Sequence, residues 1–566
     1  MADAILDNDR KEYHEPSAEE RENYYYGLAG KPKLVARTGR DHWVKPHHLR
    51  SAWVSYPVWS KKYFWPIRDD DEIVSKWSKE LATIIVKTLE PYPWSHFFPV
   101  KTPLEADDCL DEKQISKINE QQPIILLIAI LKNSMGWETG IKMAFECLKV
   151  LHNHDIFIEV EVYEGAHQRN AISAELESKI DPIFWSPAHT IYLSNANKEV
   201  LPLLSYSGYA VGYLKDHHKW GTIGLHVTLG RSKKVYGLTC RHVVDSGQPL
   251  TRSYDASRKD QRQYHIHGTD SIVAGALENL KDLQTWNEAG LKKLYDKQTR
   301  WELSHHMDTS ESSRRPTKSY KDTIVLCEAT HKYTEELIES VKKVSASTNN
   351  ERIIGHLAFY PRFEISTRIL GYMRDWALIE LDKQKYPDGF ENKVYLGDLP
   401  RTNEFDYRFK RFDGSLVDLE PRSKHPEELL YHSAEKKSFI VAKRGAASGV
   451  SLGTINAIEA VVRGPKPDGG HYASWEMLII PEGGKGKFSE GGDSGSCVFD
   501  ENCQVVGMVV GSSLVRNSRV PDGSISPEED TERGDETTDI TFAVAIDQVF
   551  DDIEEFTGSR PRLVGY

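Results

Sequence analysis

The sequence predicts a multidomain protein, with an N-terminal α/β domain followed by an all-β domain that carries a helical insertion. Three observations support this fold class. The chain has 566 residues, which favours two or three domains because a single core seldom grows to that size. A strand, a helix and a second strand follow one another before residue 170. Beyond residue 200, short apolar runs alternate with glycine-rich turns, as in antiparallel β proteins.

Residues 1–170 are predicted to form the α/β domain, whose role the sequence does not indicate. A helix is expected to begin at Asp71, because apolar residues recur at helical spacing after it. The continuous apolar run 123–131 predicts a strand that is buried on both faces. Ser134 is the expected N-cap of the next helix, and residues 156–163 alternate in the manner of a strand. Together the last three elements form one βαβ unit.

Residues 171–204 are predicted as a linker and residues 205–556 as the β domain, followed by a C-terminal tail at 557–566. The polar stretch from about 250 to 345 is the predicted helical insertion, because leucines recur there at helical spacing. An acidic loop is expected at 521–539, where eight acidic residues accompany one arginine. The predicted strands of the domain include 221–229, 235–239, 377–381, 505–510 and 541–546.

Composition narrows the class of protein. Hydrophobic residues make up 39% and charged residues 28% of the chain, which is typical of a folded globular protein. The net charge of −13 argues against a nucleic-acid partner, because such binding neutralises phosphates with Lys and Arg. The longest apolar run is also shorter than the roughly 20 residues that a membrane helix needs. We therefore expect no nucleic-acid partner and no membrane association.

The N-terminal residues and the cysteines predict an intracellular, cytoplasmic location. No basic start followed by an apolar stretch is present, so we expect no secretory signal. The six cysteines show no zinc-ligand spacing. Cys497 and Cys503 are close in sequence, but a disulfide scaffold is not expected in a reducing compartment. We also expect no metal and no cofactor; nucleotide binding in particular has no support, because the chain lacks a glycine-rich phosphate loop.

Three short sequences in the β domain carry residues suited to nucleophilic catalysis. They are GLTCRHVV at 237–244, GYMRDWALIEL at 371–381 and GGDSGSCVF at 491–499. Each alone has an ordinary structural explanation; glycine, aspartate and serine, for example, are common turn formers. Together, in the order His, Asp, Ser, they resemble the chymotrypsin-like (trypsin-like) serine peptidases. The resemblance covers about residues 205–555 in separate pieces and does not extend to 1–170.

The resemblance implies a chymotrypsin-like double β-barrel and a serine endopeptidase that forms an acyl-enzyme with a protein or peptide substrate. It assigns His242 as the base, Asp375 as the acid that orients the base, and Ser494 as the nucleophile. A serine hydroxyl needs such a base, and a carboxylate on the second ring nitrogen fixes the imidazole tautomer. The amide N–H groups of Gly492 and Ser494 would form the oxyanion hole.

The sequence departs from the family in features that bear on activation and specificity. No basic residue followed by Ile/Val-Val-Gly-Gly precedes the β domain, so the chain resembles the intracellular, non-zymogen members. Asp493, whose family counterpart pairs with a newly cut N-terminus, therefore needs another partner. Cys240 lacks the disulfide mate seen beside the family's histidine.

An acidic residue six positions before the nucleophile selects basic side chains in the family; here Phe488 favours an apolar or small one, and Val510 is expected to line the same substrate pocket.

Two other functions remain open at this stage. The β domain could be a catalytically silent pseudo-protease that acts as a binding or regulatory module. It could also be a self-processing protease, with residues 1–200 as a pro-region or regulatory region. A regulatory partner is expected to dock on the N-terminal domain or on the helical insertion. The acidic loop at 521–539 would attract basic substrates if it overhangs the cleft.

Overall fold

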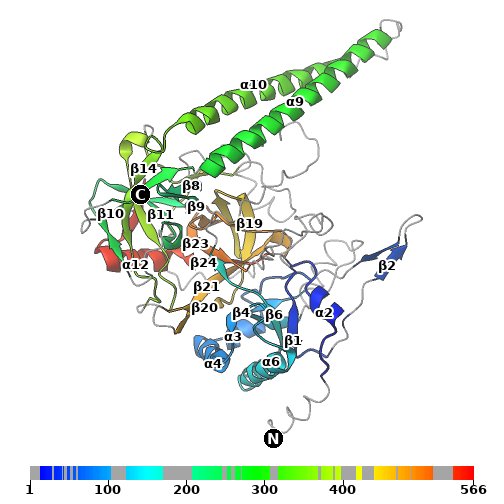
Figure 1. Ribbon diagram of the computed structural model, residues 1–566, viewed down its shortest axis with the longest axis vertical. Coiled ribbons are helices and arrows are strands. Elements are labelled where there is room, and N and C mark those ends of the chain that lie inside the picture. Colours follow the sequence, from blue (N-terminus) through cyan, green and yellow to red (C-terminus); the bar gives the residue numbers. More distant parts are fainter. Residues whose placement is uncertain are drawn as a thin grey trace.

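Two curled β-sheets, each with helices attached, make up the part of the chain that the computed structural model describes (Figure 1). The described residues are 13–28, 31–40, 43, 47–50, 55–58, 62–102, 123–169, 207–244, 252–256, 262–268, 270–305, 316–366, 371–386, 389–396, 416–422, 439–466, 470–484, 486–513 and 539–566. The predicted linker at 171–204 lies outside them, and so does the predicted acidic loop apart from Asp539.

The N-terminal unit is a four-stranded sheet with helices packed against one face. β5 and β6 are parallel and are joined by α6, so the predicted βαβ unit is confirmed. Alternate residues of β5 pack into two different hydrophobic clusters, one beneath the helices and one shared with the β domain, which explains its continuous apolar sequence. The elements of this unit are β1 (Leu34–Arg37), α3 (Glu72–Lys76), α4 (Lys79–Leu89), β4 (Trp94–Lys101), β5 (Ile124–Ile130), α6 (Trp137–His152) and β6 (Glu159–Glu164).

Two local predictions for this unit need correction. The helix expected to run on from residue 71 is broken in two, because Trp77 adopts an extended backbone and Ser78 caps a new helix, with the Leu81 amide donating to Ser78 Oγ at 3.1 Å. Ser134 is not the N-cap of α6. That position is Gly136, and the Ser134 hydroxyl donates instead to the carbonyl that closes the preceding turn.

A ring of six antiparallel strands follows in the same sheet. β4 pairs with β20 (Ala460–Pro465), and β20 pairs with β21 (His471–Pro481), so the N-terminal sheet continues into the ring. Each strand is hydrogen-bonded to the next, and the last pairs again with β21. After β21 the members are β19 (Gly449–Ile455), β18 (Phe439–Gly445), β22 (Cys497–Asp500), β23 (Val505–Ser512) and β24 (Thr541–Ala545).

The second sheet is a curled strip of antiparallel strands in the order β25-β10-β11-β15-β14-β13-β8-β9, with β12 beside β14. The run predicted as one strand at 221–229 forms two strands that meet at Gly224, where a side chain would lie 2.2 Å from the carbonyl oxygen of Gly495. The bounds are β8 (Tyr209–Tyr213), β9 (Asp216–Ile223), β10 (Leu225–Leu229), β11 (Val235–Thr239), β12 (Tyr254–Asp255), β13 (Tyr264–His267), β14 (Ile353–Tyr360), β15 (Ala377–Leu381) and β25 (Pro561–Leu563).

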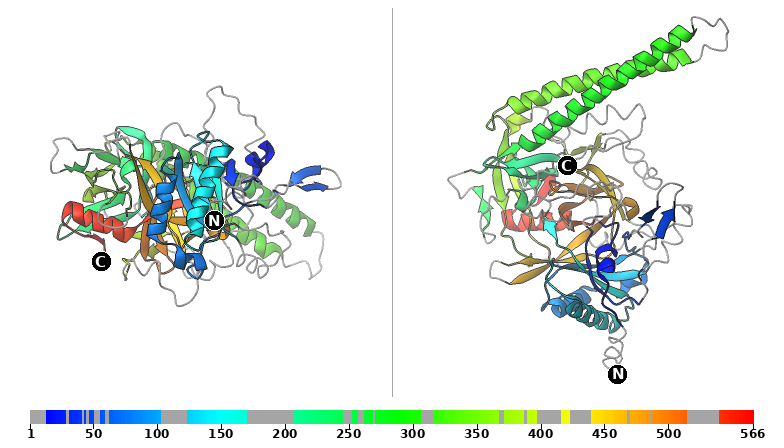
Figure 2. Two further views of the ribbon diagram at one scale, coloured as in Figure 1. Left: turned by 90° about the horizontal axis from the view of Figure 1, so that it is seen from below. Right: turned by 45° about the vertical axis from the view of Figure 1, so that its right-hand side comes forward.

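The helices expected between about 250 and 345 form one long hairpin. α9 (Asp270–His305) and α10 (Pro316–Ala346) pack against each other and connect β13 to β14. The hairpin projects away from both sheets (Figures 1 and 2). It begins later than predicted, because β12 and β13 belong to the sheet. Among the described helices, none is both long and apolar enough to span a bilayer.

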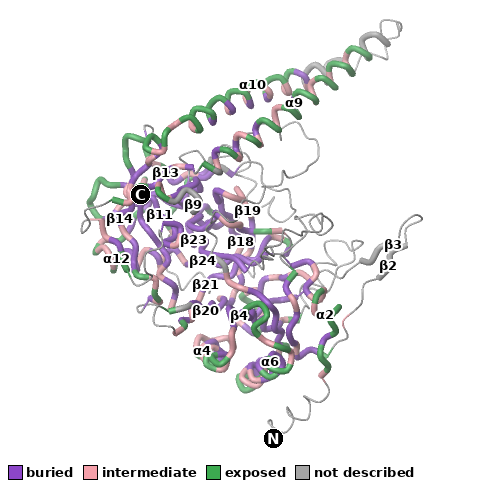
Figure 3. The backbone as a smooth tube through the Cα atoms, in the orientation of Figure 1, coloured by how far each residue is buried: buried purple, intermediate pink, exposed green. Residues whose placement is uncertain are grey.

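Several smaller elements complete the described part of the chain. α12 (Ile546–Thr557) follows the last strand of the ring, and the predicted tail after it contributes β25 to the second sheet. Figure 3 shows burial concentrated in the strands and exposure along the hairpin. The five described cysteines, Cys497 and Cys503 included, are free thiols. The smaller elements are α2 (Ala18–Asn23), β2 (His47–Arg50), β3 (Ser55–Val58), β7 (Gln168–Arg169), α8 (Arg241–Val244), β16 (Lys393–Tyr395), β17 (Leu416–Asp418) and two short 3₁₀ turns.

Candidate active site

His242, Asp375 and Ser494 meet where the two sheets face each other. His242 lies on α8, the short helix that follows β11. Asp375 precedes β15, which is paired with β11, so that Thr239 and Ala377 are opposite each other. Ser494 lies in the turn before β22 of the ring. Neighbouring antiparallel strands therefore place the histidine and the aspartate side by side, and the ring supplies the serine.

The three side chains form a continuous chain of hydrogen bonds. His242 Nδ1 lies 2.6 Å from Asp375 Oδ2, and His242 Nε2 lies 2.7 Å from Ser494 Oγ. The backbone amide of His242 donates to Asp375 Oδ1 at 3.0 Å. Both carboxylate oxygens thus accept from the same residue, which fixes the imidazole ring. With Nδ1–H directed at the carboxylate, Nε2 would accept a proton from the serine hydroxyl.

Burial differs among the three groups in a way that matters for access. The Asp375 side chain is 0% exposed and that of His242 is 12% exposed. Ser494 is fully buried. A carboxylate shielded from water interacts more strongly with a neighbouring imidazolium than an exposed one does. The His242 side chain is therefore the most accessible of the three.

Cys240 raises the question of a metal. The ligand atoms of Cys240, His242 and Asp375 lie within 4.8 Å of one another, a spacing that would suit an ion. The hydrogen bonds supply these atoms with other partners: Cys240 Sγ donates to the carbonyl oxygen of Val509 at 3.2 Å, and the imidazole contacts the carboxylate and the serine. The arrangement therefore fits a serine–histidine–aspartate chain better than a metal centre.

The loop that carries Ser494 is tied to both sheets. The amide of Thr222, on β9, donates to the Ser494 carbonyl oxygen at 2.8 Å. Thr222 Oγ1 donates to the carbonyl oxygen of Gly492, also at 2.8 Å. On the ring side, the amide of Gly495 donates to the Val509 carbonyl oxygen at 2.9 Å. These bonds hold the nucleophile against His242.

Among the described residues, two amides in this loop have no acceptor. Those of Asp493 and Gly495 donate to carbonyl oxygens, at 3.0 and 2.9 Å. Within the described part of the chain, no acceptor lies within hydrogen-bond distance of the amides of Gly492 and Ser494. These are the two donors that the sequence assigns to an oxyanion hole, and such donors must be available to the developing negative charge.

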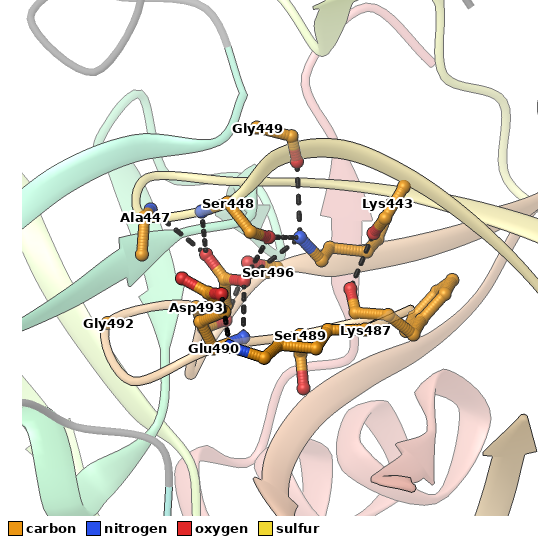
Figure 4. A network of polar contacts seen from close by, with 12 residues as sticks. Lys443, Ala447, Ser448, Gly449, Lys487, Ser489, Glu490, Gly492, Asp493 and Ser496 are labelled. Carbon is orange, nitrogen blue, oxygen red and sulfur yellow. Dashed lines mark hydrogen bonds and ion pairs between the residues drawn. The ribbon is translucent and has the colours of Figure 1, made fainter. Parts of the chain in front are cut away.

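Asp493 has a partner that sequence reasoning missed. Its carboxylate lies 2.9 Å from Lys443 Nζ, and both side chains are 0% exposed (Figure 4). Lys443 belongs to β18, where it follows the apolar start of the strand, FIVA. A lysine within a buried strand is a signal that sequence alone offers, although it does not name the partner.

The two predicted pocket residues are not brought together. Phe488 is fully buried inside the ring, in a cluster that includes Val441 and Val509. Val510 faces the opposite side of β23 and packs in the core shared by the two sheets. Their joint role in a substrate pocket stays a prediction. Asp539, the described residue of the expected acidic loop, is buried.

Comparison with known proteins adds no relative. No family model matches the sequence, and no curated protein matches it.

Proposed function

We propose that this chain is a serine-type endopeptidase of the chymotrypsin-like superfamily, of divergent, intracellular and non-zymogen type. The observation that carries the proposal is the unbroken chain of hydrogen bonds from Asp375 through His242 to Ser494. The substrate would be a protein or peptide, with an apolar or small side chain before the cleaved bond. No cofactor takes part in the proposed reaction.

The fold supports the same proposal. The closed ring of β18, β19 and β21 to β24 is one barrel of antiparallel strands, and the curled strip of β8 to β15 would be the other. The histidine and aspartate come from one sheet and the serine from the other. A double barrel of this kind would hold the reacting groups between its two halves, and the meeting of these three residues between the two sheets supports that arrangement.

The proposed reaction follows from the hydrogen bonds. Ser494 Oγ attacks the peptide carbonyl carbon while its proton passes to His242 Nε2. The carbonyl oxygen, now negative, would accept from the amides of Gly492 and Ser494. The imidazolium, stabilised by Asp375, then donates its proton to the leaving amine, which breaks the peptide bond and leaves an acyl-enzyme. Water, deprotonated by His242, hydrolyses that ester and restores the serine.

The test is covalent labelling with a fluorophosphonate probe. We expect the probe to label Ser494 in the wild type, and labelling to be lost in Ser494→Ala and His242→Ala. Ser513→Ala is a matched control, because Ser513 Oγ lies 3.4 Å from His96 Nε2 in a second buried serine–histidine contact. That pair differs from the candidate site because His96 Nδ1 contacts Ser95 Oγ, at 3.3 Å, instead of a carboxylate; burial also lowers the pKa of His96, to about 3.

A negative result would be equally informative. If the folded wild-type protein is not labelled, the active-enzyme proposal is wrong and the pseudo-protease function takes its place. Circular dichroism on the same sample would show that the protein is folded. Labelling that persists in Ser494→Ala would assign the reactive group to another residue.

A further inference from the structure

Lys443 is a cation held entirely inside the protein. Its ammonium group donates to Asp493 Oδ2, to the Ser448 hydroxyl and to the Gly449 carbonyl oxygen (Figure 4). An ammonium group has three donors, so all of them are used. Burial lowers the pKa of Lys443, while the adjacent Asp493 carboxylate opposes this effect by favouring the charged form.

Asp493 is held from several directions at once. Its carboxylate also accepts from the amides of Ala447 and Ser448, at 3.0 and 3.1 Å, and from the amide of Glu490, at 2.9 Å. A side chain at Gly445 would lie 2.0 Å from Asp493 Oδ1, so the strand keeps space for this carboxylate. The carboxylate joins the end of β18 to the loop that carries the nucleophile.

The position of Asp493 suggests what this network does. It stands between Gly492 and Ser494, the two residues whose amides have no acceptor among the described residues. Burying two charges costs several kcal/mol per ion, and well-packed apolar residues often serve stability as well or better. The ion pair is therefore better explained by the geometry that it imposes on the loop than by overall stability.

We propose that Lys443 is a positioning residue. Through its ion pair with Asp493 it orients the amides of Gly492 and Ser494 towards the oxyanion, and it does so without any cut in the chain. This inference rests on the proposed function. The cation comes from β18 of the folded chain, so neither a new N-terminus nor a covalent step is needed. The site would thus be formed as soon as the ring of strands has folded.

The test compares the rate constant of labelling (kinact) with the probe's reversible affinity (KI) in purified full-length protein. We expect Lys443→Met to lower kinact for the fluorophosphonate by about 10²-fold, as when an oxyanion donor is lost, with KI nearly unchanged. Lys487→Met is the matched control, because Lys487 forms an exposed ion pair with Glu490 in the same loop; its kinact should equal that of the wild type. The intact mass of the labelled wild type should be that of the uncut chain.

The outcomes separate this inference from the proposed function. A folded Lys443→Met protein that is labelled at the wild-type rate would overturn the role of Lys443 alone. If that variant does not fold, Ser448→Ala decides, since Ser448 contacts both charges; a severalfold lower kinact supports the role and an unchanged one refutes it. Labelling found only in cleaved chains would also refute it. A wild type without labelling would refute the proposed function.

A second, independent observation concerns the end of β23 that extends past its pairing with β22. The short strand β7 pairs with it in antiparallel fashion, with Gln168 opposite Ser512 and Arg169 opposite Gly511. Val509, further along β23, is hydrogen-bonded through its backbone to Gly495 and Ser496, the residues after the nucleophile. From Gln168 to Arg169 the chain therefore runs along β23 towards the nucleophile loop.

Residues before β7 fix it in place. The amide of His167 donates to Ser95 Oγ at 2.9 Å. The His167 ring packs on Phe542 of β24 and lies 3.4 Å from the buried carboxylate of Glu476. The strand is thus anchored to the N-terminal unit and to the ring at once.

We infer that β7 occupies the edge at which an extended peptide substrate would add as a strand. Peptides often bind by adding a strand to an open sheet edge, because the main chain supplies the hydrogen bonds. Because β7 of the same chain already pairs with this part of β23, it excludes peptide substrates from it. On the proposed function, the N-terminal unit would thus restrain the digestion of protein substrates.

The test removes the pairing while keeping the full chain. Proline lacks the amide that a strand donates, so the double variant Gln168→Pro/Arg169→Pro should free the edge. We expect it to digest fluorescein-labelled casein faster, on the order of tenfold, because apparent affinity scales with the fraction of chains in which the edge is free. The variant Gln168→Ala/Arg169→Ala keeps the main-chain bonds and should match the wild type.

A proline variant that folds, is labelled by the fluorophosphonate and digests casein at the wild-type rate would overturn this inference. If it does not fold, His167→Ala, which loosens the anchor, should give a smaller rise; no rise would refute the role of β7. Absence of labelling from the folded wild type would instead show that the proposed function fails.

Discussion

Replacing Asp375 with asparagine is expected to slow acylation of Ser494 by on the order of 10⁴-fold while leaving the fold intact. The reason lies in the two oxygens of the carboxylate. One accepts from the backbone amide of His242 at 3.0 Å, and the other contacts the ring Nδ1 at 2.6 Å. Asparagine can satisfy the backbone amide only with its carbonyl oxygen, so its NH₂ group must face Nδ1. The imidazole must then carry its proton on Nε2, where it cannot accept one from serine.

The measurement is kinact for the fluorophosphonate, with thermal melting as the check on folding. Asp382→Asn is the matched control, because Asp382 lies at the opposite end of β15, where its side chain accepts from the amide of Gln384 at 3.0 Å. Its labelling rate should not change. An Asp375→Asn protein within tenfold of the wild type would show that the carboxylate does not set the tautomer.

Replacing Gly492 with alanine is expected to lower kinact by about 10²–10³-fold, which is the effect of losing one oxyanion donor. Gly492 has a φ of +100°, a region that residues with a side chain rarely adopt. A Cβ atom there would also lie 2.4 Å from the ring of Trp220. The peptide must therefore rotate or shift, which moves the amide N–H away from the developing charge.

Gly558→Ala separates loop geometry from general strain. Gly558 also has a positive φ, of +76°, but it caps α12 and has open space around it. The Gly558→Ala protein should be less stable than the wild type but should keep the wild-type kinact. The double variant Gly492→Ala/Trp220→Ala removes the Trp220 indole. It should regain part of kinact if the contact between the new Cβ and the indole displaces the amide. A Gly492→Ala protein with unchanged kinact would remove this amide from the mechanism.

The predictable parts of this protein are those in which a local pattern and a local structure coincide. The βαβ unit was predictable because β5 is buried on both faces and so has no polar positions. The residues that meet at the candidate site were predictable through motif resemblance, because the resemblance indicates which distant residues come together in the fold. His242 and Ser494 are 252 positions apart, and no periodicity links them.

What could not be predicted depends on pairing across long distances. Nothing in the sequence near Lys443 indicates that its ammonium group meets Asp493, because that contact follows from how β18 pairs in the ring. The start of α6 was misplaced because Ser134 has the chemistry of a cap, whereas the chain turns at Gly136. Phe488 and Val510 were paired by family position, but they lie in different clusters.

The shared sheet has a consequence for how the protein is made. β4 leaves the ribosome early, but its partner β20 is synthesised much later; contacts at this junction join residues more than 350 positions apart, such as Asn456 and Pro99. At a synthesis rate of 5–20 residues per second, the edge of β4 stays unpaired for roughly 20–70 s until β20 has been made. Open strand edges invite pairing with other chains. We therefore expect the nascent chain to depend on chaperones during this interval, and fragments that end before β20 to aggregate.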